Sequence, residues 1–364
     1  MTLRYDTVVI GAGAMGSATA WWLARRGRAV LLVEQFEQGH DRGSSHGGSR
    51  IFRYAYPDPA HSRLAVVARP LWTELEDDAG ETLIDVIGAL DHGDPALVGP
   101  LADAMTAAGV PFEALDPEAA QERWPHLRFE GTVLHQPEAG RCRADAAVAA
   151  LARRAAHYGA EVRYGVGPAR VAVAGDGVRV IVGDEAVEAR TVVVTAGAWL
   201  ARTVGREVPL PPLRVTEEQL VYFPPRVEPK TLTEWPSFIH HTDRFWYGLH
   251  TPGLGIKLGG HHEGDAIDPD HRREELDPDY VAGLVRYAEH WVPGVVPEPN
   301  APSTCLYTTT SDERFLLDRR GPIVIGSACS GHGFKFAPLI GRLLADLTDG
   351  IAPKGPFRRL DDAS

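Results

Sequence analysis

The sequence predicts an α/β fold made of two interleaved parts, one built on a parallel β-sheet and one mostly antiparallel. Three observations favour this fold. The first 34 residues have the pattern strand, glycine turn, helix, strand; later apolar runs are typical of strands that return to the same sheet; and two stretches richer in proline lack this rhythm. The chain has 364 residues, 44% of them hydrophobic, which is enough for one large or two interleaved domains.

The turn after the first predicted strand has the spacing GxGxxG, which is typical of a dinucleotide-binding βαβ unit. Gly11 permits the tight turn, Gly13 lets the backbone approach a pyrophosphate, and Gly16 lets the helix lie close to the strand. The N–H groups of the first helical turn, which includes Ala14 and Met15, would face the phosphates. The turn therefore predicts a dinucleotide site.

An acidic residue ends the second strand of this unit. Glu34 follows Val30-Leu31-Leu32-Val33 and lies about 20 residues beyond the last glycine of the turn. A carboxylate at this place accepts hydrogen bonds from ribose hydroxyls and repels a 2′-phosphate. FAD or NAD is therefore favoured over NADP.

The uncharged run 8–24 has a second interpretation, as a signal peptide or a membrane span. It is short for a span, it contains three glycines, and it has Asp6 before it and Arg25-Arg26 after it. The dinucleotide-binding interpretation is therefore preferred.

Charge and cysteine content limit the partners. The formal net charge of −12 opposes binding to nucleic acid or to an anionic membrane, so small molecules are the expected partners. Cys142, Cys305 and Cys329 form no CxxC pair, which indicates neither a disulfide framework nor a zinc site and fits a cytoplasmic location. Adjacent histidines at 240–241 and 261–262 point in different directions and have no carboxylate at ligand spacing, so no metal is expected.

A second α/β segment begins near residue 143. An alanine-rich helix that ends near Tyr158 precedes the strand-like runs 161–164, 171–173, 178–182 and 191–195. The last run is followed directly by Ala196-Gly197-Ala198-Trp199, and a turn of small residues at the carboxyl end of a strand is where ligands lie in such sheets. Val171 and Gly197 are the candidate cofactor contacts of this segment.

Two stretches with short strand-like runs interrupt the α/β pattern, from about Leu83 to Gln136 and from about Val208 to Pro302. We expect them to form one mostly antiparallel substrate domain, 83–136 and 208–302. The segments 1–82, 137–207 and 303–364 then form a discontinuous nucleotide-binding domain. To this domain 323–326 adds a strand and 339–347 a closing helix, and 361–364 is expected to be a frayed tail.

Two alternating runs each present functional side chains on one face. The run 303–310 should be extended, which places Cys305 and Tyr307 on one face, although a buried cysteine is more often only a small core residue. The run 255–261 likewise places Lys257, Gly259 and His261 together. Lysine and histidine would then bracket room for a flat ligand, unless Lys257 is simply exposed.

Two loops rich in glycine are candidates for contact with a cofactor. The loop 330–336 precedes the last predicted helix, its glycines suit close backbone approach, and Lys335 could meet a substrate anion. The loop 43–53 offers small donors together with Arg50 and Arg53, and a guanidinium can bind a carboxylate with two parallel hydrogen bonds. The alternative for these arginines is an exposed surface position.

In their order along the chain, these segments resemble the monomeric sarcosine oxidase and N-methyltryptophan oxidase family, within the wider glycine and D-amino-acid oxidase group of flavoproteins. The resemblance covers about residues 5–350 and rests on the glycine turn with the motifs GSSHGGSRIFR (43–53), STCLYTTTSDERFLLD (303–318) and SGHGFKF (330–336). It implies a Rossmann-type FAD-binding domain with an interleaved, mostly antiparallel α+β substrate domain. It also implies FAD attached through Cys305, a secondary amine substrate with a carboxylate, and molecular oxygen reduced to hydrogen peroxide.

The resemblance also implies roles for single residues. Arg50 resembles the arginine near the flavin ring, and Arg53 with Lys335 resembles the pair that binds the substrate carboxylate. Lys257 resembles the lysine that activates oxygen. His261 and Tyr307 resemble groups that line the amine site. Tyr247 resembles another such group, and the loop between Tyr247 and Lys257 is one residue shorter than in sarcosine oxidase. The further expected cofactor contacts lie in the motif loops: Ser44, Ser45, Gly331, His332, Gly333, Phe334 and Lys335. Gly260 stands where sarcosine oxidase has a bulky aromatic residue, which bears on the size of the substrate.

The expected activity is oxidation of the C–N bond of an N-alkyl or cyclic α-amino acid to an imine, by a monomer. Three alternatives stay open: an amino-acid dehydrogenase of the same fold with a quinone or protein acceptor, a non-catalytic flavin-binding subunit, and an NAD dehydrogenase. Oxygen consumption separates the first from an oxidase. The set of Arg53, Lys257, His261 and Lys335 argues against the second, and nothing in the third explains the Cys305 strand or the loop 330–336.

Overall fold

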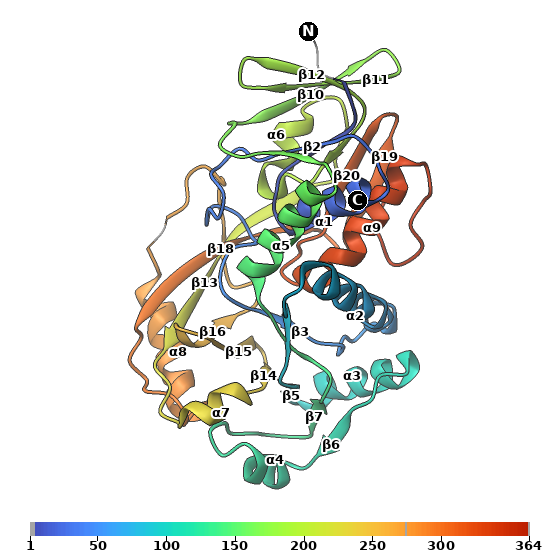
Figure 1. Cartoon of the computed structure of the whole chain (residues 1–364). Coiled ribbons are helices and arrows are strands. Elements are labelled where there is room, and N and C mark those ends of the chain that lie inside the picture. The colour runs from blue at the N-terminus through green and yellow to red at the C-terminus, as the bar shows by residue number, and fades with distance from the viewer. Residues whose placement is uncertain (1–3, 274, 363–364) are drawn as a thin grey trace.

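The computed structural model describes residues 4–273 and 275–362, which form three β-sheets covered by helices (Figure 1). In the first sheet β12, β1, β2 and β9 run parallel in this order, and β20 pairs in parallel with β12. The antiparallel strands are β11 and β10, which continue from β12, and β19, which pairs with β20. Its strands are β1 (Arg4–Ile10), β2 (Val30–Val33), β9 (Glu161–Arg163), β10 (Ala169–Ala174), β11 (Gly177–Val182), β12 (Glu185–Val194), β19 (Leu316–Arg320) and β20 (Ile323–Ser327). These strands confirm the predicted nucleotide-binding sheet.

The two faces of the first sheet have different covers because neighbouring side chains of a strand point in opposite directions. Val9 and Leu32 belong to a core cluster with the helices α1 (Ala14–Arg25), α5 (Ala144–His157) and α9 (Ala337–Thr348). Val8 and Leu31 belong to a second cluster, covered by the β10–β11–β12 meander and α6 (Leu200–Val204). The uncharged run 8–24 therefore forms β1, the glycine turn and most of α1. No helix of the described part of the chain is long and apolar enough to span a membrane.

The second sheet is mostly antiparallel, as predicted. Its order is β17-β13-β16-β15-β14-β5-β7-β6, with β18 paired to β13, and β14 and β5 are parallel to each other. Its strands are β5 (Ala89–Gly93), β6 (Glu113–Leu115), β7 (Val133–Gln136), β13 (Leu213–Phe223), β14 (Ser237–His241), β15 (Phe245–Thr251), β16 (Gly255–Gly260), β17 (Asp265–Ala266) and β18 (Ala301–Thr310). One face packs on α8 (Pro278–Trp291) through Leu284, Tyr287 and Ala288, which leaves the other face available for a site.

A small third sheet joins the two parts. Its strands are β3 (Arg50–Phe52), β8 (Gly140–Cys142) and β4 (Ile84–Val86), in the order β3-β8-β4. The remaining elements are α2 (Pro59–Ala79), α3 (Pro95–Ala108), α4 (Pro117–Arg123), α7 (Pro229–Thr233) and the 3₁₀ helices η1 (Gly197–Trp199) and η2 (Phe334–Phe336).

Two of the predicted domain boundaries need correction. Residues 303–310 were expected in the nucleotide-binding domain, but β18 pairs with β13 from Ala301 to Thr310 and so belongs to the second sheet. Residues 84–86 were expected in the substrate domain, but β4 pairs with β8 in the small sheet. The physical reason is the same in both cases: the sheet to which a short strand belongs is decided by its backbone pairing with a strand that is distant in sequence. The expected frayed tail, 361–364, lies partly outside the described residues.

Candidate cofactor and substrate site

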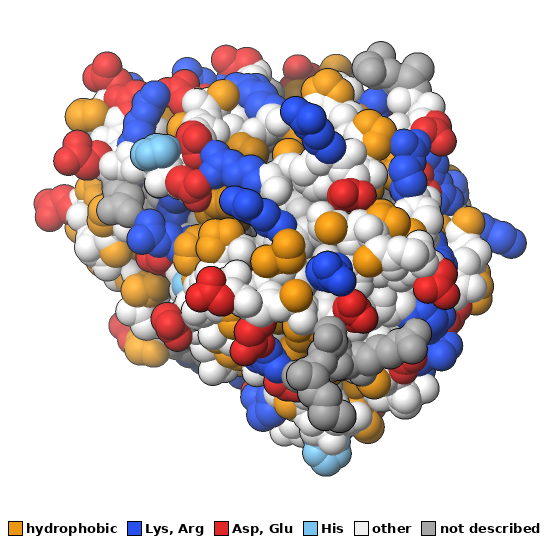
Figure 2. All heavy atoms as spheres, turned by 90° about the horizontal axis from the view of Figure 1, so that it is seen from above, with side chains coloured by type: hydrophobic (Ala, Val, Ile, Leu, Met, Phe, Trp, Pro, Cys, Tyr) orange, Lys and Arg blue, Asp and Glu red, His pale blue; other side chains and the backbone are white. Residues whose placement is uncertain are grey.

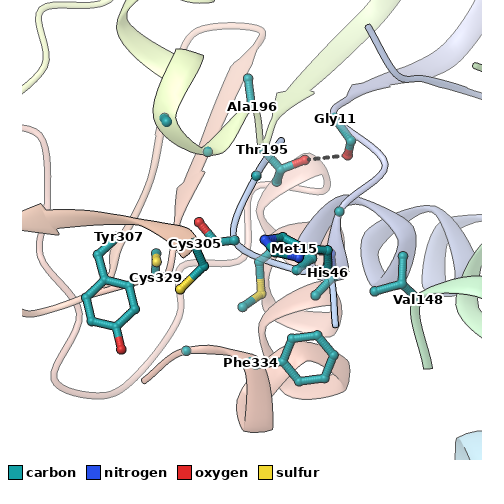
Figure 3. Close-up of a pocket in the computed structure, with 18 of the residues that line it drawn as sticks. Gly11, Met15, His46, Val148, Thr195, Ala196, Cys305, Tyr307, Cys329 and Phe334 are labelled. Atoms are coloured by element: carbon teal, nitrogen blue, oxygen red, sulfur yellow. Dashed lines mark hydrogen bonds between the residues drawn. The ribbon is translucent and has the colours of Figure 1, made fainter. Parts of the chain in front are cut away.

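A cavity of about 920 Å³ lies between the first and second sheets. Its wall combines the glycine turn and the carboxyl ends of β1, β2 and β12 with the inner face of β15, β16 and β18. Figure 3 shows Cys305 and Tyr307 at one side of this space and Gly11 and Val148 at the other. The cavity is therefore elongated, and it joins the two sets of residues that the sequence singled out.

The glycine turn has the geometry expected of it. Gly11 has φ +96°, and a Cβ built on it would lie 2.6 Å from the carbonyl oxygen of Thr195. A Cβ on Gly16 would lie 1.8 Å from the carbonyl oxygen of Gly11, so α1 can approach β1 only with glycine here. Gly16 thus acts in packing and does not itself line the cavity. The N-cap residue of helix α1 is Gly13, which offers no side-chain oxygen to the first turn, so the N–H groups beyond Ala14, which Ser45 binds, can face an anion.

Glu34 lies in the cavity wall at the end of β2 and is 6% exposed. Its carboxylate accepts hydrogen bonds from the backbone N–H groups of Ala12, at 2.8 Å, and Phe36, at 3.1 Å. The glycine turn and the carboxylate are therefore held together, as the ribose-binding hypothesis requires.

The loop 43–49 is organised by Arg50. The guanidinium donates hydrogen bonds to three carbonyl oxygens of this loop, those of Ser44, His46 and Ser49, at 3.0, 2.6 and 2.8 Å. Ser45 Oγ accepts a hydrogen bond from Ala14 N at 3.1 Å, which ties the loop to the start of α1. Ser44, Ser45 and Arg50 all line the cavity, as predicted.

His46 is a cavity residue that was not singled out from the sequence. Burial, followed by the charge of Arg50, lowers the pKa of its imidazole to about 4. Its Nε2 is buried and has no hydrogen-bond partner within the described residues. A neutral imidazole nitrogen thus faces the cavity beside the glycine turn. Only its place inside the glycine-rich motif could have indicated this role.

Cys305 lies on β18 with its thiol toward the cavity, and it is 7% exposed. Tyr307, two residues on, lines the same cavity, which confirms the predicted common face. Burial raises the pKa of the Cys305 thiol, and the charges of Arg50 and Lys257 act in the opposite direction. A second thiol, Cys329, also lines the cavity and is seen near Cys305 in Figure 3.

Lys257 lies on β16 and is 3% exposed, so the exposed alternative was wrong. Its Nζ donates a hydrogen bond of 2.8 Å to the carbonyl oxygen of Ser49. Burial, followed by the charge of Arg50, lowers the pKa of Lys257 well below its ordinary value. Lys257 thus lies in the cavity wall, and its protonation state depends on the charged groups that surround it.

The space above Gly259 is filled by Tyr247. A Cβ on Gly259 would lie 2.7 Å from the hydroxyl oxygen of Tyr247, which reaches across from β15. The prediction that Lys257, Gly259 and His261 bracket open room for a flat ligand was therefore wrong at Gly259, because the phenol occupies that room. A Cβ on Gly260 would meet Glu263 and Tyr280, so this position does not face the cavity.

His261 and Tyr307 lie together at the second-sheet side of the cavity. His261 Nδ1 is 3.4 Å from the Tyr307 hydroxyl oxygen. Burial, followed by the charge of His262, lowers the pKa of His261 to about 3, so the imidazole is neutral at physiological pH. A Cβ on Gly331 would lie 2.4 Å from Tyr307 and 2.5 Å from His261. The predicted glycine loop therefore packs against both rings.

The turn that follows His261 is held by a buried carboxylate. Glu218 is 2% exposed and lies on β13 opposite Cys305. One of its oxygens accepts hydrogen bonds from the backbone N–H groups of Glu263 and Gly264, both at 3.0 Å. The other accepts a hydrogen bond of 2.5 Å from the hydroxyl of Thr216. Glu218 had no sequence signal, because the backbone groups that it holds, Glu263 and Gly264, lie 45 and 46 positions away.

Two cations meet at the loop 330–336. Lys335 is 5% exposed, and its Nζ donates hydrogen bonds to the hydroxyl of Tyr56, at 2.7 Å, and to the carbonyl oxygen of His332, at 2.8 Å. The guanidinium carbon of Arg53 lies 4.3 Å from the ring centre of Tyr56. Arg53 Nη1 is buried without a partner within the described residues. Burial, followed by the charge of Arg53, lowers the pKa of Lys335 well below its ordinary value.

The remaining predicted cofactor contacts divide into two groups. Most of them line the cavity: Gly13, Ala14, Met15, Gly197, Gly331, His332, Gly333 and Phe334. Val171 does not line it. Its side chain belongs to a core cluster, while residues 166–170, from the preceding loop and the first two positions of β10, reach the cavity.

The paired histidines do not form metal sites. Within residues 4–273 and 275–362, no group of three or more His, Cys, Asp or Glu side chains is arranged to hold a metal ion. His240 instead stacks on His92, and His241 Nε2 donates a hydrogen bond of 2.7 Å to Oδ1 of Asp91.

Comparison with known proteins decides the family. Residues 6–347 match the family model described as FAD dependent oxidoreductase. The chain belongs to this FAD-dependent oxidoreductase family. It is 34% identical to the peroxisomal sarcosine oxidase of Homo sapiens, over 97% of this chain and 95% of that protein. It is 30% identical to the monomeric sarcosine oxidase of Bacillus sp. strain NS-129, over 95% and 93%.

A solved structure is also similar. The structure of NikD, described as an unusual amino acid oxidase essential for nikkomycin biosynthesis, superposes with a TM-score of 0.86 at 27% identity. It covers 98% of this chain and 99% of NikD. The predicted family and α/β fold class are thereby confirmed.

The residues of the cavity fit FAD, the cofactor of this family. The N–H groups at the start of α1, the carboxylate of Glu34 and the unpartnered His46 Nε2 supply the donors and acceptors that an adenine dinucleotide requires. Gly11 and Gly13 present only backbone to the cavity at this end. The enzyme is therefore a flavin-dependent oxidoreductase.

Proposed function

We propose that this enzyme oxidises the C–N bond of an N-alkyl or cyclic α-amino acid to an imine and passes the two electrons and two protons to O₂, which gives H₂O₂. The observation that carries the proposal is the pair of cations at one side of the cavity. Lys335 and Arg53 share Tyr56, and Arg53 Nη1 is buried without a partner within the described residues. A buried unpaired guanidinium N–H is costly unless a ligand supplies an acceptor.

A substrate carboxylate is the natural acceptor for these cations. Charge-assisted hydrogen bonds from Arg53 and Lys335 would fix the carboxylate and so the α-carbon. The neutral imidazole of His261, together with Tyr247 and Tyr307, lines the adjacent space. None of these three side chains is a strong acid, so they allow the amine to stay unprotonated, as its oxidation requires. FAD supplies the redox chemistry: it accepts a hydride equivalent from carbon and transfers electrons to oxygen.

Lys257 is proposed to serve the oxygen half of the reaction. Its ammonium group lies in the wall of the same cavity and is held by the Ser49 carbonyl oxygen. A positioned positive charge stabilises negative charge that develops on oxygen more effectively inside a protein than in water. Arg50, the other cation of this wall, organises the loop and adds to the field.

Cys305 is proposed to attach FAD covalently as a thioether: its sulfur would bond to the 8-methyl carbon of the flavin, the S–H bond and one C–H bond would break, and the two electrons and two protons would pass to O₂ as H₂O₂. Its thiol lies in the cavity wall, and the structure gives it no disulfide. Arg50 and Lys257 both favour the thiolate form that a nucleophilic thiol requires. Cys329 is the competing candidate, because it lines the same cavity.

We further propose that the enzyme is a cytoplasmic monomer. Free thiols at Cys142, Cys305 and Cys329 support a reducing compartment. The name of the Bacillus relative describes that protein as monomeric, which supports a monomer here, whereas the name of the human relative places that protein in the peroxisome.

The test is peroxide release and oxygen uptake by purified enzyme with a panel of amines: sarcosine, N-methyl aromatic amino acids, pipecolate, proline and glycated amino acids. We expect one class to give equal amounts of H₂O₂ formed and O₂ consumed. Flavin reduction by a substrate without oxygen uptake would identify a dehydrogenase instead. A protein whose flavin no amine reduces would be a flavin-binding subunit.

A further inference from the structure

The segment Arg53–Tyr56 carries the groups proposed to bind the carboxylate, yet it belongs to no helix or strand. Strand β3 ends at Phe52, and α2 begins at Pro59. Arg53 lies over the ring of Tyr56, and the Tyr56 hydroxyl accepts a hydrogen bond from Lys335. The position of this irregular segment therefore sets the distance between the two cations.

A single buried side chain holds the segment. Gln136, at the end of β7, is fully buried, and its Oε1 accepts hydrogen bonds from two successive backbone N–H groups, Tyr54 at 2.7 Å and Ala55 at 3.0 Å. Irregular backbone that is buried needs such a partner, because unpaired amides in the interior are costly. Gln136 thus supplies the pairing that a neighbouring strand would otherwise give.

The orientation of the Gln136 amide is fixed by Asp91. Its Nε2 donates a hydrogen bond of 2.7 Å to Oδ2 of Asp91, whose side chain is fully buried. A carboxylate can only accept, so the amide nitrogen must face Asp91 and the amide oxygen must face the backbone. The other oxygen of Asp91 is held by His241 Nε2 at 2.7 Å. Three neighbouring strands, β7, β5 and β14, therefore support one loop segment.

We propose that Gln136 is a positioning residue for the substrate carboxylate, and that Asp91 determines the orientation in which it works. Gln136 and Asp91 do not line the cavity, so they act only through the Arg53–Tyr56 segment. This inference rests on the proposed amino-acid oxidase function. Its consequence is selective: loss of Gln136 should weaken recognition of the carboxylate and leave the rest of the reaction intact.

The experiment compares Gln136→Leu with wild type on the best substrate of the panel and on its carboxamide. For the carboxylate we expect kcat/KM to fall about tenfold through KM, because a displaced charge-assisted hydrogen bond loses most of its strength. For the carboxamide, and for reoxidation of reduced enzyme by O₂, we expect no change. Gln121→Leu is the matched control, because Gln121 on α4 also bonds a backbone group, the carbonyl oxygen of Leu127 at 2.8 Å, but this partner lies outside the Arg53–Tyr56 segment.

Gln136→Glu covers the case in which the leucine variant does not fold. The new carboxyl would lie beside Asp91, and two carboxylates that share a site raise the pKa of one of them. When protonated, it reproduces both hydrogen bonds of glutamine; when ionised, it repels Asp91. Relative to wild type, its kcat/KM for the carboxylate should be retained near pH 6 and lost near pH 9, roughly the range that a raised pKa would span.

Equal losses for the carboxylate and the carboxamide, or equal effects of Gln136→Leu and Gln121→Leu, would overturn the positioning role. If no amine reduces the wild-type flavin, the proposed function fails, and the inference is then decided by binding of acetate, followed through the flavin absorbance. Weaker acetate binding by Gln136→Leu than by wild type supports the inference. Equal binding by the two proteins overturns it.

Discussion

The Nζ atom of Lys257 lies 2.8 Å from the carbonyl oxygen of Ser49, so a lysine of the second sheet is bonded to the residue that precedes Arg50 in the small sheet. The bond connects the two walls of the cavity at the place where β3 begins with Arg50. Its loss should therefore be seen in the chemistry of the site and only weakly in the fold.

Lys257→Met should separate the two half-reactions. Reduction of the flavin by substrate under anaerobic conditions should change little, because the charge that Lys257 counters develops only on oxygen. Reoxidation should slow by roughly 100- to 1,000-fold, the usual effect of removing one preorganised electrostatic contact. Stopped-flow absorbance measures both steps. Slow reduction with wild-type reoxidation would instead place Lys257 in the amine site.

Cys305→Ser should abolish covalent flavin attachment. In wild type, the yellow colour should stay with the protein after acid precipitation, and in the variant it should pass into the supernatant. Cys329→Ser is the matched control, because Cys329 lines the same cavity and should leave attachment intact. Release of all flavin from the wild-type protein would remove the covalent bond from the proposal and leave FAD itself untouched.

Lys335→Met should weaken binding of a carboxylate substrate by about 10- to 100-fold, because a charge-assisted hydrogen bond is worth roughly 1.5–3 kcal/mol. The corresponding carboxamide should lose much less, since it brings no negative charge. Steady-state kinetics with the acid and amide pair measures the difference. An equal effect on both would assign Lys335 to the support of Tyr56 and His332 alone.

Glu218→Ala should destabilise the turn that carries His261. The substitution leaves the N–H groups of Glu263 and Gly264 and the hydroxyl of Thr216 without their acceptor, at about 1–3 kcal/mol for each buried group. We expect a lower unfolding midpoint together with reduced kcat/KM. Glu218→Gln keeps an acceptor oxygen and should restore most of both. A fully active alanine variant would show that the turn holds itself.

His126→Phe should reduce the loss of folding stability that occurs as the pH is lowered. Burial lowers the pKa of His126 from 6.5 to about 4, so the unfolded chain binds a proton that the folded chain refuses. The stability associated with neutral His126 is present above pH 6.5 and is lost as the pH falls towards 4, by up to about 3 kcal/mol. Phenylalanine keeps the ring contact with Trp235 and cannot titrate.

Urea unfolding at several pH values measures this slope. His271→Phe is the control, because the His271 side chain is 82% exposed and should not alter the pH dependence. Identical slopes for wild type and the His126 variant would show that His126 takes up its proton at the same pH in the folded and the unfolded chain.

Periodicity and spacing predicted much of the fold and part of the site. The βαβ unit, the common face of Cys305 and Tyr307, and the glycine loop beside Lys335 all follow from local patterns that the backbone enforces. The sheet to which β18 belongs could not be predicted in this way, because the residue pattern of a strand does not determine which strand it pairs with. The same limit left the assignment of residues 84–86 wrong.

The parts of the site that were missed depend on contacts between distant segments. Tyr247 fills the space above Gly259 from another strand, and Gln136 bonds to Tyr54 and Ala55 across more than 80 positions. Such partners leave no local trace in the sequence. Val171 lies outside the cavity wall for a related reason, since only the first two residues of its strand, Ala169 and Arg170, reach the cavity.

The first sheet is completed by the end of the chain, since β20 lies beside β12 and α9 packs with α1 in one core. During synthesis the glycine turn therefore leaves the ribosome long before residues 323–348, which enclose it. Pairings between such distant segments make folding slow, and the incomplete sheet exposes apolar surface in the meantime. We therefore expect FAD to be captured only after residues 323–348 have been synthesised, and truncation within α9 to cost the protein its cofactor as well as its fold.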